Sequence, residues 1–374
     1  MDFSLSERDK MLQSAAREFA QKSVLPRSAE IDRTAEFPVD LAEQMRTLGF
    51  YGLSFSVELG GSGAGCLGLT LVTEQICQAS MAVGVILALC ASVGDELLHH
   101  GTEEQKQEYL LPLVRGEALP FWAFTESSTG SDPKAIQTIA KPNDDGYCIS
   151  GEKLFISIVP AAKWGVVFAK DEVARVSAFI VHTSASGFVQ GSLHDVMGAR
   201  GMGSSTIYLN DVKVPGTALL GSKGRGYQIL LEGVGLERLA VAIGCLGVGQ
   251  QAVDLSVGYA KQRLAYGEPI GNLPTIQWLL AEMQCRLQAS RWMTYRTAFL
   301  RDQGEPIIVE SAEAKLFCSQ AVVDIARMAL EVHGAYGTER TLPVERLYRD
   351  AKMTEIIVGV SEIQRVLIAS SLLK

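Results

Sequence analysis

The spacing of hydrophobic residues near the N-terminus predicts helices. The first run has residues three and four positions apart, which share one helical face: Met11, Leu12, Ala15, Ala16, Phe19 and Ala20. Ser4 and Glu7 stand three apart just before this run and predict a capping box. A second helix is expected to open at Phe37-Pro38 and to end at Gly49. The glycine-rich residues 63–68 match a dinucleotide-binding spacing but follow no clear strand, so they predict a turn between helices.

The middle of the chain changes to a strand-like texture. Short β-rich segments at residues 164–169, 176–181 and 205–214 are separated by turn residues, which predicts a compact β domain. Helical periodicity returns near Tyr227, in long segments whose wide apolar faces are typical of a bundle: residues 250–262, 277–301 and 311–332. The predicted fold class is α+β, with a helical domain over residues 1–120, a β domain over 121–226 and a helical domain over 227–374.

Composition narrows the classes of function. The chain has 374 residues, is 47% hydrophobic and carries a net charge of −8 with no basic run, which argues against nucleic acid as the main partner. The apolar run at residues 81–91 is shorter than the ~18–20 residues of a membrane span, and the N-terminus lacks a signal-peptide pattern. We therefore expect a cytoplasmic protein. Seven scattered cysteines without a CxxC pair, and five histidines without ligand spacing, predict no metal site.

Six motifs, spaced along the chain, together resemble the acyl-CoA dehydrogenase family. They are TESSTGSD (125–132), GEKLFIS (151–157), DVKVP (211–215), RLAYGEPIG (263–271), HGAYG (333–337) and YRDAKMTEIIVGVSEIQR (348–365). The resemblance implies an N-terminal helical domain, a middle β domain and a C-terminal four-helix bundle. It also implies FAD as cofactor, an acyl-CoA or carrier-protein acyl thioester as substrate, electron-transfer flavoprotein or a similar acceptor, and a homotetramer in which FAD reaches a neighbouring subunit.

The resemblance also assigns the cofactor residues. Trp122, Thr125 and Ser131 would come from the strand and loop beside the flavin ring, and Phe155 and Ser157 would contact the ring from the next motif. From the residues alone, Trp122 and Phe155 fit the core of the β domain equally well, and the hydroxyls fit ordinary turns.

A second group of assigned residues lies towards the C-terminus. Arg263 matches the arginine that meets the FAD pyrophosphate of the adjacent subunit, since a guanidinium binds phosphate through two parallel hydrogen bonds. Tyr266 would accompany it, and Gly334 would permit close backbone approach, although Gly334 also fits a plain helix C-cap. The resemblance further implies FAD contacts at Glu331, Val360 and Glu362, and substrate contacts at Ser131, Arg238 and Val358.

The catalytic base is the informative position. In many members of the family a Glu precedes the Gly of the C-terminal motif, but this chain has Val358 there, and valine cannot accept a proton. A second group, which includes isovaleryl-CoA dehydrogenase, places the base on an earlier helix, immediately before an arginine. Glu237-Arg238 matches that pattern, so Glu237 is the predicted base; in isolation it fits a surface glutamate paired with a cation. Val358 would still offer its backbone N–H to the thioester carbonyl.

Several positions depart from the family pattern on the FAD side: Ile158, Leu273-Pro274, Glu331, Ala335 and Val360. A carboxylate ~4 Å from a phosphate costs up to ~4 kcal/mol at an effective dielectric of ~20, so Glu331 points elsewhere, is protonated, or weakens FAD binding. Three hypotheses stay open. They are a dehydrogenase of a short or branched acyl-CoA, a member with a changed reaction (enoyl reductase, desulfinase-like, or oxidation of a carrier-bound acyl group), and a partner subunit of a hetero-oligomeric dehydrogenase.

Overall fold

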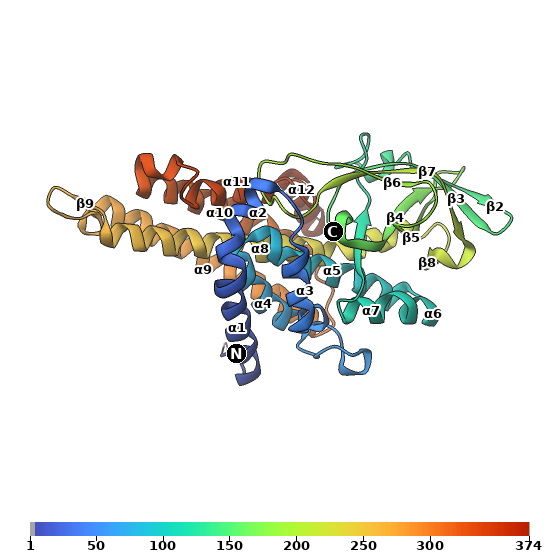
Figure 1. Cartoon of the computed structure of the whole chain (residues 1–374), viewed down its shortest axis with the longest axis horizontal. Coiled ribbons are helices and arrows are strands. Elements are labelled where there is room, and N and C mark those ends of the chain that lie inside the picture. Colours follow the sequence, from blue (N-terminus) through green and yellow to red (C-terminus); the bar gives the residue numbers. More distant parts are fainter. Residues whose placement is uncertain (1–3, 374) are drawn as a thin grey trace.

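The computed structural model describes residues 4–373 and begins with a layer of helices (Figure 1). These helices are α1 (Glu7–Phe19), α2 (Ser28–Thr34), α3 (Val39–Thr47), α4 (Gly65–Ala79), α5 (Met81–His100), α6 (Glu103–Gln105) and α7 (Leu111–Val114). The predicted capping box at Ser4 is wrong. The helix begins at Glu7 and its N-cap is Ser6, whose hydroxyl accepts a hydrogen bond from the Asp9 amide at 3.1 Å. The stop at Gly49 is confirmed, because this glycine has a left-handed backbone with φ 71°.

Of the glycine-rich residues 63–68 predicted as a turn between helices, residues 63 and 64 precede α4, but residues 65–68 form its first turn, so that part of the prediction is wrong. A carboxylate of the same chain occupies the helix start: the amides of Cys66 and Leu67 donate to Asp302 at 2.6 and 2.9 Å. A Cβ at Gly65 would lie 2.6 Å from that carboxylate, so glycine is needed there. The exposed amides of this helix start are therefore satisfied from within the chain.

Helix α5 is the one helix of the described residues that is long and apolar enough to cross a membrane by length and composition. Within the fold, 83% of its most apolar window is buried, as in the core helix of a globular protein. It packs between α4, α8 and the first strand of the β domain.

The β domain follows as one sheet in the order β6-β7-β3-β2-β4-β5-β8, with β1 parallel to β4. Its interior is apolar, with Phe121, Val167 and Phe179 almost fully buried. The three predicted strand segments fall within β4, β5 and β7. The strands are β1 (Leu119–Ala123), β2 (Ile139–Asn143), β3 (Gly146–Ile156), β4 (Ala162–Lys170), β5 (Val176–His182), β6 (Phe188–Leu193), β7 (Ser205–Pro215) and β8 (Leu219–Leu220).

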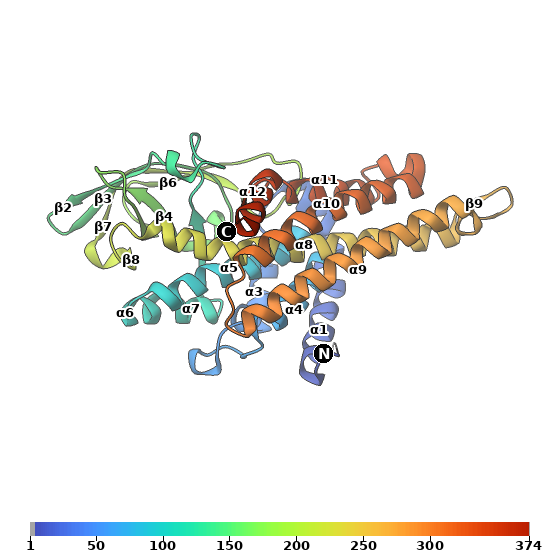
Figure 2. The ribbon, with the colours of Figure 1, turned by 180° about the vertical axis from the view of Figure 1, so that it is seen from behind.

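The C-terminal helices extend away from the sheet (Figure 2). They are α8 (Gly226–Gln262), α9 (Pro274–Asp302), α10 (Ile308–His333), α11 (Val344–Thr354) and α12 (Ser361–Leu372); a short hairpin of β9 (Leu264–Ala265) and β10 (Glu268–Pro269) joins α8 to α9. The order of helices, sheet and helices confirms the predicted fold class.

Helix α8 connects all parts of the molecule, since it packs against α4, α5, α9, α10 and α11. Its 37 residues correspond to a length of about 55 Å. Glycines permit this crowding: a Cβ at Gly247 would lie 2.4 Å from the Cys77 Cβ and 2.6 Å from the Gln78 amide nitrogen. Each glycine costs roughly 1 kcal/mol in helix propensity, which the close packing of helices offsets.

Candidate active site

Glu237 lies inside α8 with only 6% of its surface exposed, so it is not a surface glutamate. Its carboxylate makes no hydrogen bond to any residue between 4 and 373. Burial therefore raises the pKa of Glu237 to about 8, against the opposing effect of the neighbouring Arg238 cation. A carboxyl group that changes charge near neutral pH is suited to proton transfer.

A second buried carboxyl, which sequence reasoning missed, stands beside it. Glu96 of α5 is 3% exposed, and its Oε1 accepts a hydrogen bond from the indole of Trp122 at 2.9 Å. Its Oε2 is buried without a partner. Burial, and then the charge of Glu237, raises the pKa of Glu96 well above its ordinary value. The available signal was an acidic pair, Asp95-Glu96, directly after a long apolar run.

Gly233 makes room for this carboxyl pair. A Cβ at Gly233 would lie 2.1 Å from Glu96 Oε1, so the Glu96 carboxyl rests directly on the backbone of α8. Glu237 follows one helical turn later on the same face, and helical side chains lean towards the N-terminus. The two carboxyl groups therefore approach each other over Gly233.

Arg238 adds a buried cation to this region. It is 5% exposed, its Nε is buried without a partner, and it makes no hydrogen bond within the described chain. Burial lowers its pKa, while Glu237 opposes that change. A guanidinium without partners in a buried position is prepared to receive an anionic or polar group of a ligand.

The loop between α11 and α12 carries Val358, which has a left-handed φ of 53°. The Val358 carbonyl accepts a hydrogen bond from the side chain of Gln364 at 3.3 Å. Its amide N–H has no acceptor among residues 4–373. The Val358 N–H, which was predicted to donate to the thioester carbonyl, is therefore available as a donor.

The predicted flavin residues of the β domain lie on β1, β3 and the loops that follow them. Trp122 is half-buried, with its ring 5.1 Å from that of Phe168. Phe155 is 59% exposed, has φ 58° and stacks on His194 at 4.4 Å, so it does not belong to the core. Thr125 and Ser157 are half-buried, and Ser131 is exposed in the loop after β1.

The other predicted cofactor residues lie at the far end of the long helices. Arg263 is exposed, with its guanidinium 5.8 Å from the ring centre of Tyr336, and Tyr266 is 95% exposed at the tip of the hairpin. Gly334 is the C-cap of α10, and nothing lies within 4 Å of the position a Cβ would take. Glu331 pairs with Arg327 at 2.5 Å, so its charge is compensated.

The predicted flavin residues of the β domain and the predicted cofactor residues at the far end of the long helices cannot contact one FAD molecule within a single chain. Glu237 and Arg263 are separated by 26 residues of continuous helix and its cap, which corresponds to about 39 Å. The β domain and the β9 hairpin stand at opposite ends of the molecule in Figure 1. The remaining predicted positions, Val360 and Glu362, lie at the start of α12, where Glu362 is exposed 3.8 Å from Arg365.

Two of the departures from the family pattern have structural roles in this chain. Ile158 is 2% exposed, has φ 69°, and donates its amide to the Met202 carbonyl at 2.8 Å, so its side chain belongs to the core. Pro274 is the first residue of α9, where the missing N–H has no helical partner to lose. Ala335 is exposed directly after Gly334.

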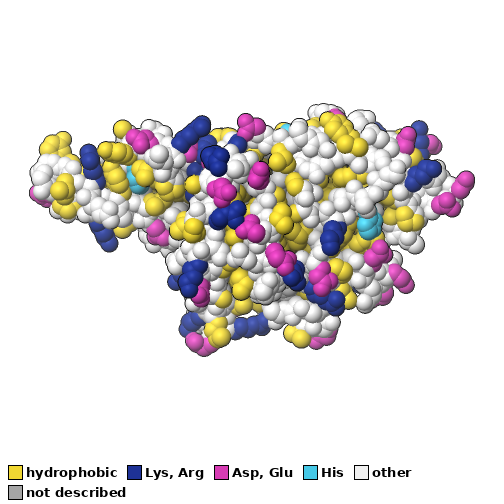
Figure 3. Space-filling view, in the orientation of Figure 1, with side chains coloured by type: hydrophobic (Ala, Val, Ile, Leu, Met, Phe, Trp, Pro, Cys, Tyr) yellow, Lys and Arg dark blue, Asp and Glu magenta, His cyan; other side chains and the backbone are white. Residues whose placement is uncertain are grey.

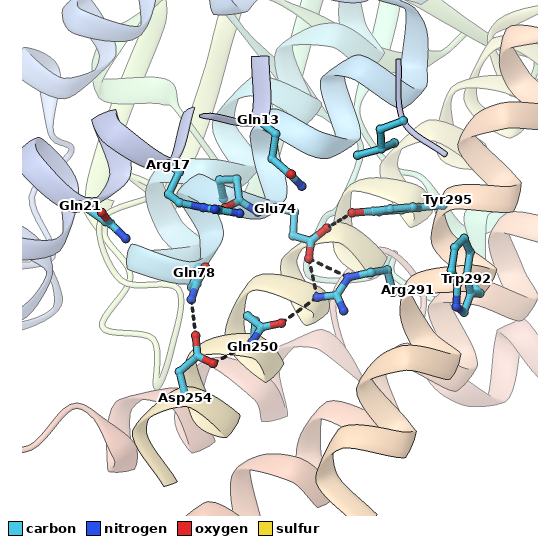
Figure 4. Close-up of a pocket in the computed structure, with 12 residues that line it drawn as sticks. Gln13, Arg17, Gln21, Glu74, Gln78, Gln250, Asp254, Arg291, Trp292 and Tyr295 are labelled. Atoms are coloured by element: carbon cyan, nitrogen blue, oxygen red, sulfur yellow. Dashed lines mark hydrogen bonds and ion pairs between the residues drawn. The ribbon is translucent and has the colours of Figure 1, made fainter. Parts of the chain in front are cut away.

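A cavity of about 580 Å³ lies elsewhere, between the N-terminal helices and the bundle (Figure 4). Glu74 is buried at its base and accepts hydrogen bonds from Arg291 at 2.7 Å and from the Tyr295 hydroxyl at 2.6 Å. Gln250 completes the contact with Arg291. None of the predicted site residues lines this cavity, and its charges compensate one another. We assign it to the packing of α4 against α8 and α9.

Comparison with known proteins decides the family. Models described as the N-terminal, middle and C-terminal domains of acyl-CoA dehydrogenase match residues 6–117, 122–212 and 224–373. The chain belongs to the acyl-CoA dehydrogenase family. Members of this family are oxidoreductases that act on CH–CH bonds, and the predicted enzyme class is thereby confirmed.

Individual relatives span the whole chain. The probable acyl-CoA dehydrogenase YngJ of Bacillus subtilis is 38% identical over 380 residues, covering 100% of both proteins. A 3-(aryl)acrylate reductase of Clostridium sporogenes is 37% identical over 374 residues, covering 99% of each. Among solved structures, butyryl-CoA dehydrogenase from Megasphaera elsdenii has a TM-score of 0.98 at 33% identity and covers 100% of both chains.

The cofactor of this family is FAD, and a structure described as PigA with FAD and proline matches this chain with a TM-score of 0.94, 26% identity and 100% and 99% coverage. The residues present fit that cofactor. Phe155 presents an exposed ring, Gly334 leaves open space beside the backbone, and Glu331 brings no uncompensated charge. The predicted FAD dependence is confirmed at the level of the family.

Proposed function

We propose that this acyl-CoA dehydrogenase uses Glu237 to remove the α-proton of a short or branched acyl thioester. The observation that carries the proposal is the buried Glu237 carboxylate, which makes no hydrogen bond within residues 4–373 and has a pKa raised to about 8. The position used by many family members holds Val358, which has no acid–base chemistry. Glu237 is thus the carboxylate in this chain that matches a known placement of the base.

The surrounding residues supply orientation and electrostatics. The free amide of Val358 would donate to the thioester oxygen and stabilise the negative charge that develops there as the proton leaves. Arg238, buried beside the base, stabilises the ionised form of Glu237. Bound FAD would supply the hydride-accepting chemistry for the β-carbon. Trp122, Thr125, Ser131, Phe155 and Ser157 would hold its ring.

The reverse reaction is a second candidate. A base with a pKa of about 8 is mostly protonated at pH 7, and a protonated carboxyl can return a proton to the α-carbon of an enoyl thioester. The similarity to a 3-(aryl)acrylate reductase is as high as that to several dehydrogenases. Comparing flavin reduction by acyl-CoA with flavin oxidation by enoyl-CoA would rank the two directions.

We also propose how the enzyme is organised. Arg263, Tyr266 and Gly334 would contact the FAD of a neighbouring subunit within a homotetramer. Each chain would have three domains, divided near residues 120 and 226. Electron-transfer flavoprotein or a similar protein would accept the electrons, in the cytoplasm. Each end of the molecule carries only part of the predicted cofactor residues. This division supports a site shared between two subunits, because closed symmetric oligomers can build one site from two copies.

Glu237→Gln tests the proposed base. The amide keeps the size of the side chain but loses the basic oxygen, so anaerobic flavin reduction should slow by about 10²–10⁴-fold, with FAD content and acyl-CoA binding preserved. Glu232→Gln is the matched control, since Glu232 lies five residues earlier on α8, is exposed, and pairs with His100 at 2.8 Å. Stopped-flow spectroscopy with a substrate that reduces the wild type gives both rates. A wild-type rate in Glu237→Gln would place the base elsewhere.

A further inference from the structure

We propose that Lys315 is a positioning residue that holds the backbone amide of Val358 in place for the thioester oxygen. The proposal rests on the proposed function, because it assigns a support to a donor of that mechanism. Lys315 lies in the interior of α10 and belongs, in sequence, to none of the motifs that identified the family.

The contacts of Lys315 are made with backbone alone. Its ammonium donates to the carbonyl of Glu355 at 3.2 Å and to the carbonyl of Gly359 at 2.7 Å. The residue is 0% exposed and pairs with no carboxylate in the described part of the chain. Burying an ammonium costs several kcal/mol of hydration, and neutral carbonyl oxygens recover only part of it. A neutral side chain at this position would avoid the cost of burying a charge.

These two carbonyls bracket Val358. Glu355 lies three residues before it and Gly359 one residue after, so a single side chain fixes both ends of the segment. Gln364 adds a second anchor, with its amide donating to the carbonyls of Val358 and Gly359 at 3.3 and 2.9 Å. The carbonyls of the segment are thus occupied from inside, while the Val358 N–H is left without an acceptor among residues 4–373.

The segment needs such support because its conformation is unfavourable. Val358 is β-branched and has φ 53°, a left-handed backbone conformation that is rare and unfavourable for such a residue. Without the anchors, Val358 is expected to relax and its N–H to turn. A donor displaced by about 1 Å loses much of its effect on a developing charge.

The charge of Lys315 provides the reason for a lysine here. Its ammonium and the Arg238 guanidinium are close enough to influence each other, so a second buried cation accompanies the one that holds the segment. A thioester oxygen that gains negative charge beside Val358 would meet a positive field from both. Burial of the lysine therefore destabilises the resting protein, and its positive charge stabilises the enolate when the enolate forms.

Lys315→Met and Lys315→Gln test the proposal, with Lys352→Met as the matched control. Lys352 also contacts Glu355, but through the carboxylate at 2.5 Å on the exposed side, so its loss should leave the segment in place. The probe is (methylthio)acetyl-CoA, in which sulfur replaces the β-carbon. It can lose an α-proton but no hydride, so a long-wavelength charge-transfer band with the flavin reports enolate formation alone.

We expect both Lys315 variants to raise the probe concentration needed for the band by roughly 10–100-fold, less than the 10²–10³-fold loss of a complete oxyanion donor. Hydrogen exchange of residues 355–360, read without flavin or substrate, should become faster. The control should match the wild type in both measurements. Lys315→Gln keeps one donor and carries the test if the methionine variant does not fold.

A purely structural role would lower the melting temperature of the Lys315 variants and leave both the band and the exchange of residues 355–360 unchanged in the folded protein; that result would overturn the proposal. A wild-type protein that forms no band with the probe and is reduced by no acyl-CoA would contradict the proposed function instead. The exchange measurement would then still decide whether Lys315 holds the segment.

Discussion

At the scale of single residues, the site combines groups that are costly to bury. Glu96, Glu237, Arg238 and Lys315 are each at most 6% exposed, and no ion pair of 4 Å or less joins any two of them. Protein interiors usually pair or exclude such charges, because isolated ions lose their hydration. Their gathering around one turn of α8 is the pattern expected of a catalytic centre, where burial shifts acid–base properties towards the working pH.

The raised pKa of Glu237 predicts a pH profile. For the dehydrogenase direction the base must be ionised, so the second-order rate constant of flavin reduction should rise about tenfold per pH unit below 8 and level off above it. Glu96 and Arg238 face Glu237, so the apparent value belongs to the group as a whole. Stopped-flow measurements between pH 6 and 9 give the profile.

Lys315 complicates the alkaline side of this profile, because burial lowers its pKa to about 8 as well. Glu237→Gln separates the two groups. The variant should lose the rise below pH 8 and keep only changes that arise from Lys315. A wild-type profile that is flat from pH 6 to 9 would show that Glu237 does not titrate in the reacting enzyme.

At the scale of elements, the fit between α5 and α8 depends on Gly233. Replacing it with alanine puts a Cβ 2.1 Å from Glu96 Oε1, which must move the Glu96 carboxyl or separate the helices. We expect Gly233→Ala to lower the free energy of unfolding by about 1–3 kcal/mol, although alanine is the better helix former.

Gly258→Ala is the control for this prediction. It lies on the same helix, and nothing stands within 4 Å of the added Cβ, so the gain in helix propensity should raise the free energy of unfolding by up to about 1 kcal/mol. Denaturant unfolding of the two variants measures both. Equal stabilisation by the two alanines would mean that Glu96 does not rest against Gly233.

The sequence anticipated elements whose pattern is local and missed those set by distant contacts. Residues 277–301 and 311–332 alternate at helical spacing because one face meets the bundle, and they are helical. Within α8, helical periodicity was predicted from about Tyr227 with residues 250–262 as its clear example, whereas residues 237–249 were placed on a helix by the family resemblance, since they are all buried and show no polar face. The cap was predicted at Ser4 but lies at Ser6, because the same residue type stands at both positions and only the start of the helix tells them apart.

The candidate site likewise contains residues that the sequence predicted and residues that it missed. The family resemblance pointed to Glu237, Arg238 and Val358, because each stands at a position that the family pattern assigns to the site. Glu96 and Lys315 stayed hidden, since each lies on a helix that carries other charged residues, and its burial appears only when other segments fold over it. The hydrogen bonds of Lys315 reach residues 40 and 44 positions later in the chain, and no local sequence pattern indicates such contacts.

At the scale of the whole molecule, charged side chains are dispersed over the surface, and large apolar side chains are exposed at the elongated end, which is formed by the β9–β10 hairpin and the start of α9. Figure 3 shows acidic and basic side chains interspersed over one face, without a continuous basic stripe. The elongated end exposes Leu264, Tyr266 and Trp278, at 59%, 95% and 61%. Large exposed aromatic residues beside Arg263 support contact with a second copy of the chain, which light scattering of the purified protein would reveal as a dimer or tetramer.

A site shared between two chains predicts complementation between two inactive variants. Glu237→Gln chains lack the base but keep Arg263, whereas Arg263→Glu chains keep the base and place a carboxylate near the phosphates of the partner's FAD. In a mixed dimer, one of the two sites combines the intact Glu237 of one chain with the intact Arg263 of the other. The second site carries both changes.

Co-expression of the two variants in equal amounts should therefore restore flavin reduction in about a quarter of the sites, because half of randomly assembled dimers are mixed and each has one intact site. Each variant alone should stay near its own low rate, and FAD content should rise in the mixture above that of Arg263→Glu alone. Chains purified separately and then mixed without exchange of subunits provide the control. A site built from one chain would give no recovery in the co-expressed mixture, since every chain carries one of the two defects.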